Sequence, residues 1–197
     1  ELLIDTPNNL ILDFAARGNR YAAIVLNIGT YISEDAGVTW TLRNPTTGLS
    51  GIYGFGTALL GLSFGDGMFT MQNGSTSWVA ANNGLPSNGS FVIPKAPASQ
   101  GNTVYFGFQQ LITNFAGVAR STDVGVTWTV LDTAGMPAMN PATSNRTVAV
   151  TPTHVYYYYN TFPANSRLGV YRTAGLPSSV REVASGIPEG FSLEQNY

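Results

Sequence analysis

The chain has 197 residues, enough for one sizeable core, and only 10% of them are charged, against roughly 25% in an ordinary soluble domain. Its nine basic and eleven acidic residues are scattered singly, so no basic stripe could neutralise a phosphate backbone, which argues against nucleic acid as a partner. It has no cysteine, which excludes disulfides, thiolate metal sites and a cysteine nucleophile, and no apolar run of the ~20 residues that a membrane helix needs.

Short strand-like runs separated by turn residues follow one another along the chain. The first group comprises residues 10–16, 21–26, 30–33 and 38–42. A later group comprises 90–93, which is the weakest, 103–108, 117–121 and 126–131. No useful stretch has apolar residues at helical spacing, and glycine or proline interrupts most windows. We therefore expect an all-β protein.

An eight-residue frame occurs twice almost unchanged, at residues 33–40 and 121–128, as Ser-x-Asp-x-Gly-Val-Thr-Trp. Two degenerate copies lie at 71–78 and 173–180. The first degenerate copy has Asn73 for the aspartate and Ser77 for the threonine and keeps Trp78, whereas the second keeps only Thr173 and Ser179. A glycine and an apolar residue follow each copy: Gly48-Leu49, Gly84-Leu85, Gly135-Met136 and Gly186-Ile187. Such self-similarity indicates a repeat architecture.

The repeat length predicts a β-propeller. Trp40, Trp78, Trp128 and Val180 end the four copies and are 38, 50 and 52 residues apart, close to the ~40 to 50 residues of a four-stranded propeller blade. The repeats fall at about 10–49, 50–86, 87–137 and 138–188. We expect one domain with about four four-stranded antiparallel blades, which is either a compact four-bladed ring or part of a larger propeller.

Extra residues in the longer repeats, at Gln109–Phe115 and Thr161–Arg167, are expected to be loops that carry specificity. The segment 190–197 reads as the opening strand of a further blade or the closing strand of a four-bladed ring.

The frame is suited to a turn between the last two strands of a blade. Its aspartate can accept hydrogen bonds from backbone N–H groups just ahead, its glycine supplies a positive φ, and its β-branched threonine is expected to re-enter the strand ladder. The tryptophan would bury its ring beneath the turn, with its N–H on a carbonyl. We therefore predict a structural role for these residues: Ser33, Asp35, Gly37, Thr39, Trp40, Ser121, Asp123, Gly125, Thr127 and Trp128.

The frame resembles the Asp box, or BNR repeat, of the sialidase-like propellers. That family includes sialidases, xyloglucan-cleaving glucanases, sortilin-type receptors, a photosystem II assembly factor and other secreted proteins. The resemblance implies a propeller whose boxes lie at the blade periphery, away from the ligand face, and it implies no particular activity. The Arg-Ile-Pro signature of sialidases is missing, because the nearest match, 91–94, has Val92 in place of the arginine and lies between boxes.

The sequence gives little indication of the residue sets that glycoside hydrolases use for catalysis. A sialidase gathers three arginines, but nothing in the spacing of these eight demands a triad: Arg17, Arg20, Arg43, Arg120, Arg146, Arg167, Arg172 and Arg181. Other glycoside hydrolysis needs two facing carboxylates. Outside the boxes and the chain ends the acidic residues are Asp13, Asp66, Asp132, Glu182 and Glu189, of which Asp13, predicted within a strand, is the candidate to watch. Asp66-Gly67 reads as a tight hairpin turn.

Three further patterns have structural interpretations. Gly61–Gly65 matches the Gly-x-Ser-x-Gly elbow of serine hydrolases by letter, but it lies in a predicted strand with no histidine nearby. His154, the only histidine, has no carboxylate or cysteine companions and makes a poor metal site, and no cofactor motif is present. The run Tyr156–Tyr159 should alternate between neighbouring blades, although it and the pair Phe106 and Phe108 could alternatively form a sugar-stacking platform.

We expect a non-enzymatic binding or scaffolding module that presents propeller loops to a protein or glycan. The alternative is part of a glycoside hydrolase whose catalytic residues lie partly outside this segment, and a third possibility is a structural repeat of an adhesin-like chain. The composition, with a single lysine, is typical of a secreted or cell-surface protein of bacterial type. Asn73, Asn88 and Asn145 fit the N-glycosylation pattern, which would mark exposed turns only in a eukaryotic protein.

Overall fold

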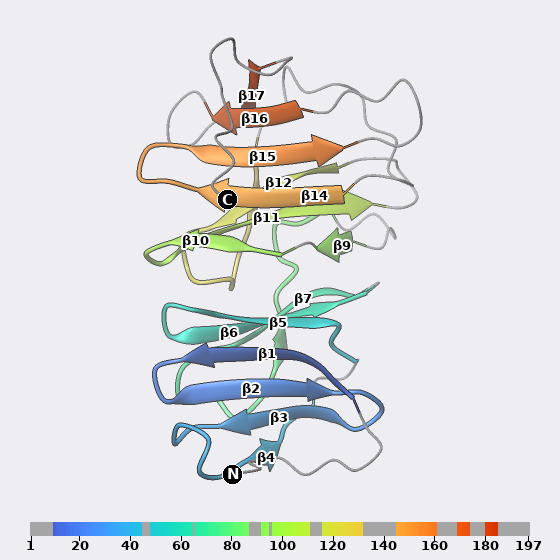
Figure 1. The fold of residues 1–197 in the computed structure, drawn as a ribbon, viewed down its shortest axis with the longest axis vertical. Helices are drawn as coiled ribbons and strands as arrows, with labels where there is room; N and C mark the ends of the chain where they lie inside the picture. The colour runs from blue at the N-terminus through green and yellow to red at the C-terminus, as the bar shows by residue number, and fades with distance from the viewer. Residues whose placement is uncertain are drawn as a thin grey trace, which may run out of the picture.

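A computed structural model describes residues 10–44, 48–64, 66–86, 92–94, 96–110, 116–131, 145–160, 169–173 and 180–184. Within these ranges the regular structure is entirely strand (Figure 1). The first eight strands are β1 Ile11–Arg17, β2 Arg20–Val25, β3 Gly29–Ser33, β4 Thr41–Leu42, β5 Gly51–Phe55, β6 Ala58–Ser63, β7 Gly67–Met71 and β8 Val79–Ala80. The others are β9 Val92–Pro94, β10 Ala98–Gln100, β11 Thr103–Gln110, β12 Ala116–Ser121, β13 Thr129–Val130, β14 Asn145–Val150, β15 Val155–Asn160, β16 Gly169–Thr173 and β17 Val180–Ala184. No helix that could cross a membrane occurs in this part of the chain.

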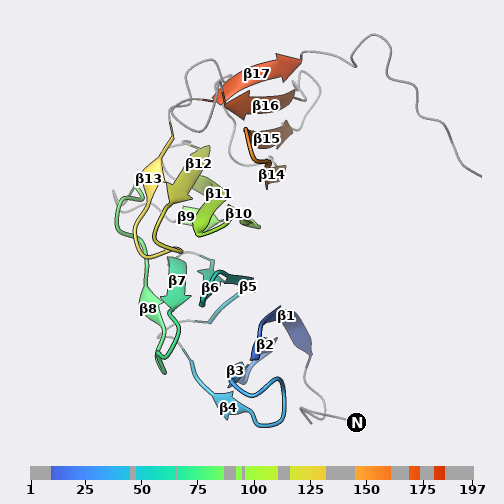
Figure 2. The same cartoon turned by 90° about the vertical axis from the view of Figure 1, so that its left-hand side faces the viewer.

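The strands form four antiparallel sheets, each ordered as in the sequence: β1–β4, β5–β8, β10–β13 with β9 added against β11, and β14–β17. We call them blades 1 to 4. Figure 2 shows the blades stacked face to face in an arc, with β1, β5, β10 and β14 toward one side of it. This is the arrangement of successive propeller blades, so the predicted all-β propeller fold is confirmed.

The last strand of a blade is shorter than its sequence suggests. In blade 1 it is β4, Thr41–Leu42, rather than 38–42, and in blade 3 it is β13, Thr129–Val130, rather than 126–131. The reason is that the N–H groups of Thr39 and Thr127 donate to the aspartates of their turns, at 2.8 and 2.9 Å, and are therefore not available to the ladder. The prediction that the threonine re-enters the ladder was wrong.

The first strand of blade 3 is divided in two. β9 pairs with the end of β11, at Phe108 to Gln110, and β10 pairs with its beginning, at Thr103 to Tyr105. Two prolines, Pro94 and Pro97, lie at this interruption and have no N–H for a ladder. Gln109 and Gln110, the first two residues of the loop predicted at Gln109–Phe115, belong instead to β11, and residues 111–115 lie outside the described part. The loop predicted at Thr161–Arg167 also lies outside it.

An apolar cluster fills each boundary between neighbouring blades. Ala22, Ile24 and Ile32 of blade 1 pack with Ile52, Leu59 and Trp78 of blade 2. Leu60 and Met68 of blade 2 pack with Phe106 and Trp128 of blade 3, and Tyr105 and Val118 of blade 3 pack with Val155 and Tyr157 of blade 4. Leu49 and Leu85, which follow the repeated glycines, enter the first and second of these clusters. The core therefore lies between blades rather than within any one of them.

Candidate functional site

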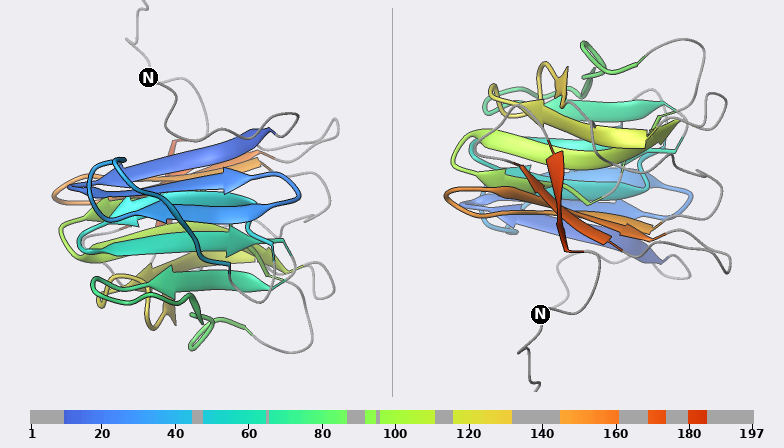
Figure 3. Two further views of the ribbon diagram at one scale, coloured as in Figure 1. Left: turned by 90° about the horizontal axis from the view of Figure 1, so that it is seen from below. Right: turned by 90° about the horizontal axis from the view of Figure 1, so that it is seen from above.

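The meander of each blade sends its turns to two opposite ends of the molecule (Figures 1 and 3). The octapeptide end carries the turns at 33–40 and 121–128 and the β1–β2 turn. The loop end carries the β2–β3 turn at 26–28 and the β6–β7 turn between Ser63 and Gly67. The sequence-predicted residues therefore lie together at the octapeptide end, in two different blades.

Both intact octapeptides are closed by the same network. Ser33 Oγ donates to Asp35 Oδ1 at 2.8 Å, Thr39 N donates to the same oxygen at 2.8 Å, and Thr39 Oγ1 donates to Oδ2 at 2.6 Å. The corresponding distances to Asp123 from Ser121 Oγ, Thr127 N and Thr127 Oγ1 are 2.6, 2.9 and 2.6 Å. The serine oxygens also accept the N–H groups of Gly37 and Gly125, at 2.8 and 2.7 Å. The carboxylates thus hold their own turns.

The turn backbone is left-handed at two successive residues. Gly37 and Gly125 have φ of 92° and 87°, as the sequence suggests, and the residues before them, Ala36 and Val124, have φ of 58° and 55°. Side chains with a Cβ rarely adopt this conformation, at a cost of roughly 1 to 2 kcal/mol per residue. No sequence signal marks this second left-handed position, because an alanine and a valine occupy it.

Hydrogen bonding keeps the turn carboxylates ionised. The hydroxyl and the N–H of Thr39, together with the hydroxyl of Ser33, lower the pKa of Asp35 from 3.8 to about 2. At Asp123 burial acts to raise the pKa, but the hydrogen bonds from Ser121, Thr127 and Val126 outweigh it and lower the pKa to about 2. Neither carboxyl group is suited to donate a proton near neutral pH.

The tryptophans that end the turns have different partners. Trp78 Nε1 donates to Arg43 O in blade 1 at 2.9 Å, and Trp128 Nε1 donates to Ala81 O in blade 2 at 2.8 Å. Trp40 Nε1 donates instead to Gly37 O in its own turn, at 2.9 Å. Two of the three indoles therefore bind the preceding blade.

The degenerate copy at 71–78 is held from outside by an arginine that the sequence analysis missed. Arg20 donates to Met71 O at 3.1 Å, to Gln72 O at 3.0 Å and to Ser75 O at 2.9 Å, and it pairs with Glu34 at 2.9 Å. Met71 has replaced the first serine of the frame and is fully buried. Hydrogen bonds from Arg20 of blade 1 thus hold this turn in place, as the internal aspartate holds the turn in the intact copies. No local sequence pattern identifies Arg20 for this role.

The remaining predicted residues of the degenerate copies are less informative. Asn73 is exposed, and Ser77 N donates to Ser75 Oγ at 3.2 Å. Thr173 is the last residue of β16 and pairs with Val180 of β17. Ser179 lies outside the described residues.

Two asparagines fasten the loop end. Asn44 Oδ1 accepts Thr30 N at 2.8 Å, and Asn82 Oδ1 accepts the equivalent Met68 N at 2.9 Å. Each asparagine follows an octapeptide tryptophan by four residues, and Asp132 has the same offset from Trp128. This offset is a sequence signal that lies outside the octapeptide frame itself.

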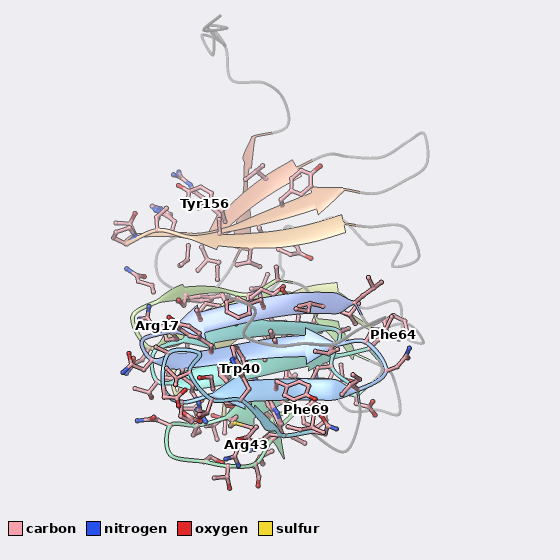
Figure 4. The ribbon with its side chains drawn as sticks, turned by 60° about the horizontal axis from the view of Figure 1, so that its bottom comes forward. Arg17, Trp40, Arg43, Phe64, Phe69 and Tyr156 are labelled. Carbon is pink, nitrogen blue, oxygen red and sulfur yellow. The ribbon has the colours of Figure 1, made fainter. Side chains whose placement is uncertain are left out.

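A hollow of about 390 Å³ opens at the loop end of blade 1. Among the described residues its lining is mostly apolar side chains and backbone, with the amide side chains of Asn27 and Asn44 and no carboxylate. These residues are Leu12, Ile24, Val25, Leu26, Asn27, Ile28, Gly29, Thr30, Asn44, Gly48 and Leu49. Phe64, 67% exposed, projects from the β6–β7 turn at the same end, away from Arg17 (Figure 4). The hollow is suited to contact with a partner, because it is concave and apolar with few polar groups.

A second hollow, of about 410 Å³, lies at the octapeptide end. Arg17, Arg20, Glu34 and Asn73 are among its lining residues, and Arg17 Nε donates to Gly56 O at 3.2 Å. Of the arginines considered for a carboxylate-binding triad, the described part of the chain brings these two to one hollow, where both also bind backbone carbonyls of blade 2. Arg43 instead donates to Thr76 O at 3.0 Å.

The described acidic side chains outside the octapeptides have structural partners. Asp13, the candidate singled out in the sequence, accepts Ile52 N of blade 2 at 2.9 Å, so it joins the first strands of two blades. Asp66 accepts Ser63 Oγ at 3.1 Å. Asp132 and Glu189 lie outside the described residues, and Glu182 lies in β17.

The alternative catalytic and binding motifs also find structural positions. Ser63 is 2% exposed in β6, and His154 closes the β14–β15 turn with Thr151 and Thr153. The described ranges contain no group of three metal-ligating side chains. Asn145 is the first residue of β14, and Asn88 lies outside the described residues.

The aromatic residues considered as a sugar platform divide into two cases. Phe106 and Phe108 are 0% exposed, because their face of β11 packs on blade 2. The alternative prediction that these two residues form a sugar-stacking platform is therefore wrong. Tyr157 is buried against blade 3, whereas Tyr158 is 38% exposed on the other face of β15.

No protein-family model matches the chain, and no curated protein matches it either. Solved structures do. The GH74 xyloglucanase from Xanthomonas campestris aligns with a TM-score of 0.59 at 14% identity, over 85% of this chain and 28% of that one. YCF48 from Cyanidioschyzon merolae aligns with a TM-score of 0.55 at 13% identity, over 93% and 59%. The Niastella koreensis GH74 enzyme aligns with a TM-score of 0.52 at 19% identity, over 87% and 30%. These likenesses establish a shared propeller fold. The chain spans less than two thirds of the length of each of these proteins.

Proposed function

We propose that the chain is a binding or scaffolding module that holds a protein or glycan partner at the loop end of its blades. The observation that carries this proposal is the composition of the loop-end hollow, which has an apolar floor, two amide side chains and no carboxylate among its lining residues. Exposed Phe64, on the β6–β7 turn, adds a further apolar side chain at the same end. A surface of this kind gains affinity from apolar burial and specificity from a few amides.

The rival function, part of a glycoside hydrolase, requires two carboxyl groups about 5 to 10 Å apart across a bond. Among the side chains that the structure describes, the carboxylates are tied to turns, to Arg20 or to the backbone of Ile52, and none lines the loop-end hollow. The likeness to GH74 enzymes concerns fold alone. We therefore favour binding over hydrolysis for this segment.

We further propose that the octapeptides are Asp boxes with a purely structural role, in one propeller domain with repeats at about 10–49, 50–86, 87–137 and 138–188. The self-contained networks around Asp35 and Asp123 support that role. For the whole protein we propose a secreted or cell-surface location in a bacterium, which the low charge and the single lysine support.

The binding proposal is tested with the chain on a glycan array and against xyloglucan oligosaccharides and unstructured peptides. For any ligand found, Leu26→Arg in the hollow should weaken binding at least about tenfold, because a buried unpaired charge costs several kcal/mol. The matched control is Val38→Arg, a change at a residue 78% exposed at the octapeptide end, which should leave affinity unchanged.

Release of sugar from xyloglucan by the chain alone would favour the hydrolase instead. Unchanged affinity in Leu26→Arg would place the binding surface elsewhere, and equal loss in both arginine variants would show that the effect is not specific to the hollow; either result contradicts the proposal.

A further inference from the structure

The tryptophans of blades 2 and 3 bind the preceding blade at the same position. Trp78 Nε1 donates to Arg43 O, and Arg43 directly follows β4, which ends at Leu42. Trp128 Nε1 donates to Ala81 O, and Ala81 directly follows β8, which ends at Ala80. The acceptor at both boundaries is thus the first carbonyl after the last strand of the preceding blade.

Blade 1 carries the same tryptophan without that acceptor. Trp40 Nε1 turns to Gly37 O of its own octapeptide, at 2.9 Å. Its ring is only half-buried, whereas Trp78 and Trp128 are 9% and 4% exposed. The indole N–H of Trp40 therefore binds within its own turn, and its ring is more exposed than those of Trp78 and Trp128.

The strand register identifies the equivalents of the other residues on this face. Tyr21 pairs with Ser33, and Leu59 pairs with Met71, where Ser33 and Met71 each begin an octapeptide copy. Two residues further along, Ala23 pairs with Phe14 in blade 1 and Gly61 pairs with Ile52 in blade 2. Phe14 is therefore the equivalent of Ile52, but it is 51% exposed where Ile52 is 2% exposed.

The same holds across the face. Tyr31 lies two residues before Ser33, and Phe69 lies two residues before Met71, so the two residues are equivalent. Tyr31 is half-buried, whereas Phe69 is 5% exposed and packs against blade 1. The Phe14 ring lies 5.9 Å from that of Tyr21 and 6.4 Å from that of Trp40. We call Phe14, Tyr21, Tyr31 and Trp40 the open face of blade 1. Its aromatic residues occupy the positions that form the boundary between blades 1 and 2 on the equivalent face of blade 2.

We propose that a further four-stranded blade of the same polypeptide, preceding residue 10, covers the open face, and that the first carbonyl after its last strand accepts the Trp40 N–H in place of Gly37 O. This occupant is argued from continuity, because the residues of the face stand at the positions that blade 2 buries against blade 1, and because the tryptophan position is also buried between blades 2 and 3. Figure 2 shows blades 1 and 4 at opposite ends of the arc, so blade 4 does not cover it. The inference is independent of what the loop end binds.

The absence of cysteine from the 197 residues allows a direct test by thiol labelling. Phe14→Cys places a thiol on the open face, and Val38→Cys, at a position 78% exposed on the octapeptide turn, is the matched control. Both thiols should react freely with a maleimide in the 197-residue chain. In the longer native polypeptide, with any other cysteines changed to serine, Phe14→Cys should react at least about tenfold more slowly and Val38→Cys at an unchanged rate.

The other outcomes overturn the proposal. Equal labelling in both proteins leaves the face uncovered. Slow labelling of Phe14→Cys in the 197-residue chain assigns the cover to a second copy if the chain sediments as a dimer, and to blade 4 if it sediments as a monomer. A native polypeptide with no blade-length segment before residue 10 also overturns it.

A second measurement serves if Phe14→Cys does not fold. With 5-fluorotryptophan incorporated, the ¹⁹F resonance of Trp40, assigned by Trp40→Phe, should show a solvent isotope shift in the 197-residue chain and lose it in the longer polypeptide. The resonance of buried Trp128 should show none in either. A Trp40 shift that persists in the longer polypeptide contradicts the proposal.

Discussion

At the scale of single residues, Asp35 and Asp123 act as internal ligands of a turn. Each carboxylate accepts two hydroxyl groups and the threonine N–H from residues within four positions of it, and Asp123 also accepts the N–H of Val126. These bonds offset the left-handed backbone at Ala36 and Val124. Because the bonds go to the charged form, the same residues make the fold sensitive to acid.

We expect the free energy of unfolding to fall as the pH drops below about 4. Asp123 has a folded pKa of about 2, below the ordinary value of 3.8, so its carboxylate stabilises the folded state above pH 3.8 and this stabilisation is lost as the pH falls through the folded pKa. Thr127→Val removes one of its donors and should move the acid transition to higher pH. Urea unfolding between pH 2 and pH 7 measures both, and identical pH profiles for variant and wild type would contradict the assignment.

A second residue-scale prediction concerns Gly84, which has φ of 86° and no space for a side chain. A Cβ there would lie 1.8 Å from the carbonyl oxygen of Trp128, which belongs to the next blade. Gly84→Ala should therefore destabilise the chain by more than the roughly 1 to 2 kcal/mol of a left-handed alanine. Gly74→Ala, at φ of 76° with open space around it, should show that conformational cost alone. Equal melting temperatures for the two variants would disprove the close approach.

At the scale of elements, a blade is completed by its neighbour. The turn at 71–78 lacks the serine and aspartate of the intact frame, and Arg20, at the start of β2, binds three of its carbonyls from the preceding blade. The equivalent position of blade 2, at the start of β6, is Ala58, and the octapeptide that it faces in blade 3 is intact. Loss of the frame in one blade thus coincides with an arginine in the blade before it.

Arg20→Met should cost about 2 to 4 kcal/mol of stability, because it leaves the carbonyls of Met71, Gln72 and Ser75 without their charged donor. Arg17→Met is the matched control, since Arg17 is exposed and makes one 3.2 Å bond to Gly56 O. Its cost should stay below about 1 kcal/mol. Chemical denaturation provides the measurement, and a mild effect at Arg20 would mean that the turn holds itself.

At the scale of the whole molecule, stability lies in the boundaries between blades. The buried clusters join residues of two blades each, and Trp128 is central to the second, where its ring meets that of Phe106 edge to face at 4.6 Å. A sheet of this kind has no core of its own and depends on its neighbours, as in other repeat architectures.

Trp128→Phe should therefore destabilise the chain by about 2 to 4 kcal/mol, because it shrinks a buried ring and leaves Ala81 O without its donor. Trp40→Phe, the same substitution at the open face of blade 1, should cost about 1 kcal/mol or less in the 197-residue chain. Thermal unfolding of the two variants compares them directly, and equal costs would indicate that Trp40 is also packed against a blade.

The local chemistry of the turns could be predicted from the sequence, because Ser33, Asp35, Gly37 and Thr39 are bonded to one another within a few positions. The meander of short strands and the number of sheets in the segment follow from the same repeats. The loop-end hollow was not found in this way, although the offset of Asn44 and Asn82 from their tryptophans was a readable signal of how that end is fastened.

Only the tertiary structure decided which residues face a neighbouring blade. It buried Phe106 and Phe108, which the sequence left open to a sugar, tied Asp13 to Ile52 N and Arg20 to a turn some fifty positions away, and gave Trp40 a different partner from Trp78 and Trp128. The physical reason is the sequence separation of the residues that make each contact. A turn closes on bonds between near neighbours, which a repeated frame records, whereas a blade boundary is made by residues distant in sequence, whose meeting depends on how the sheets stack.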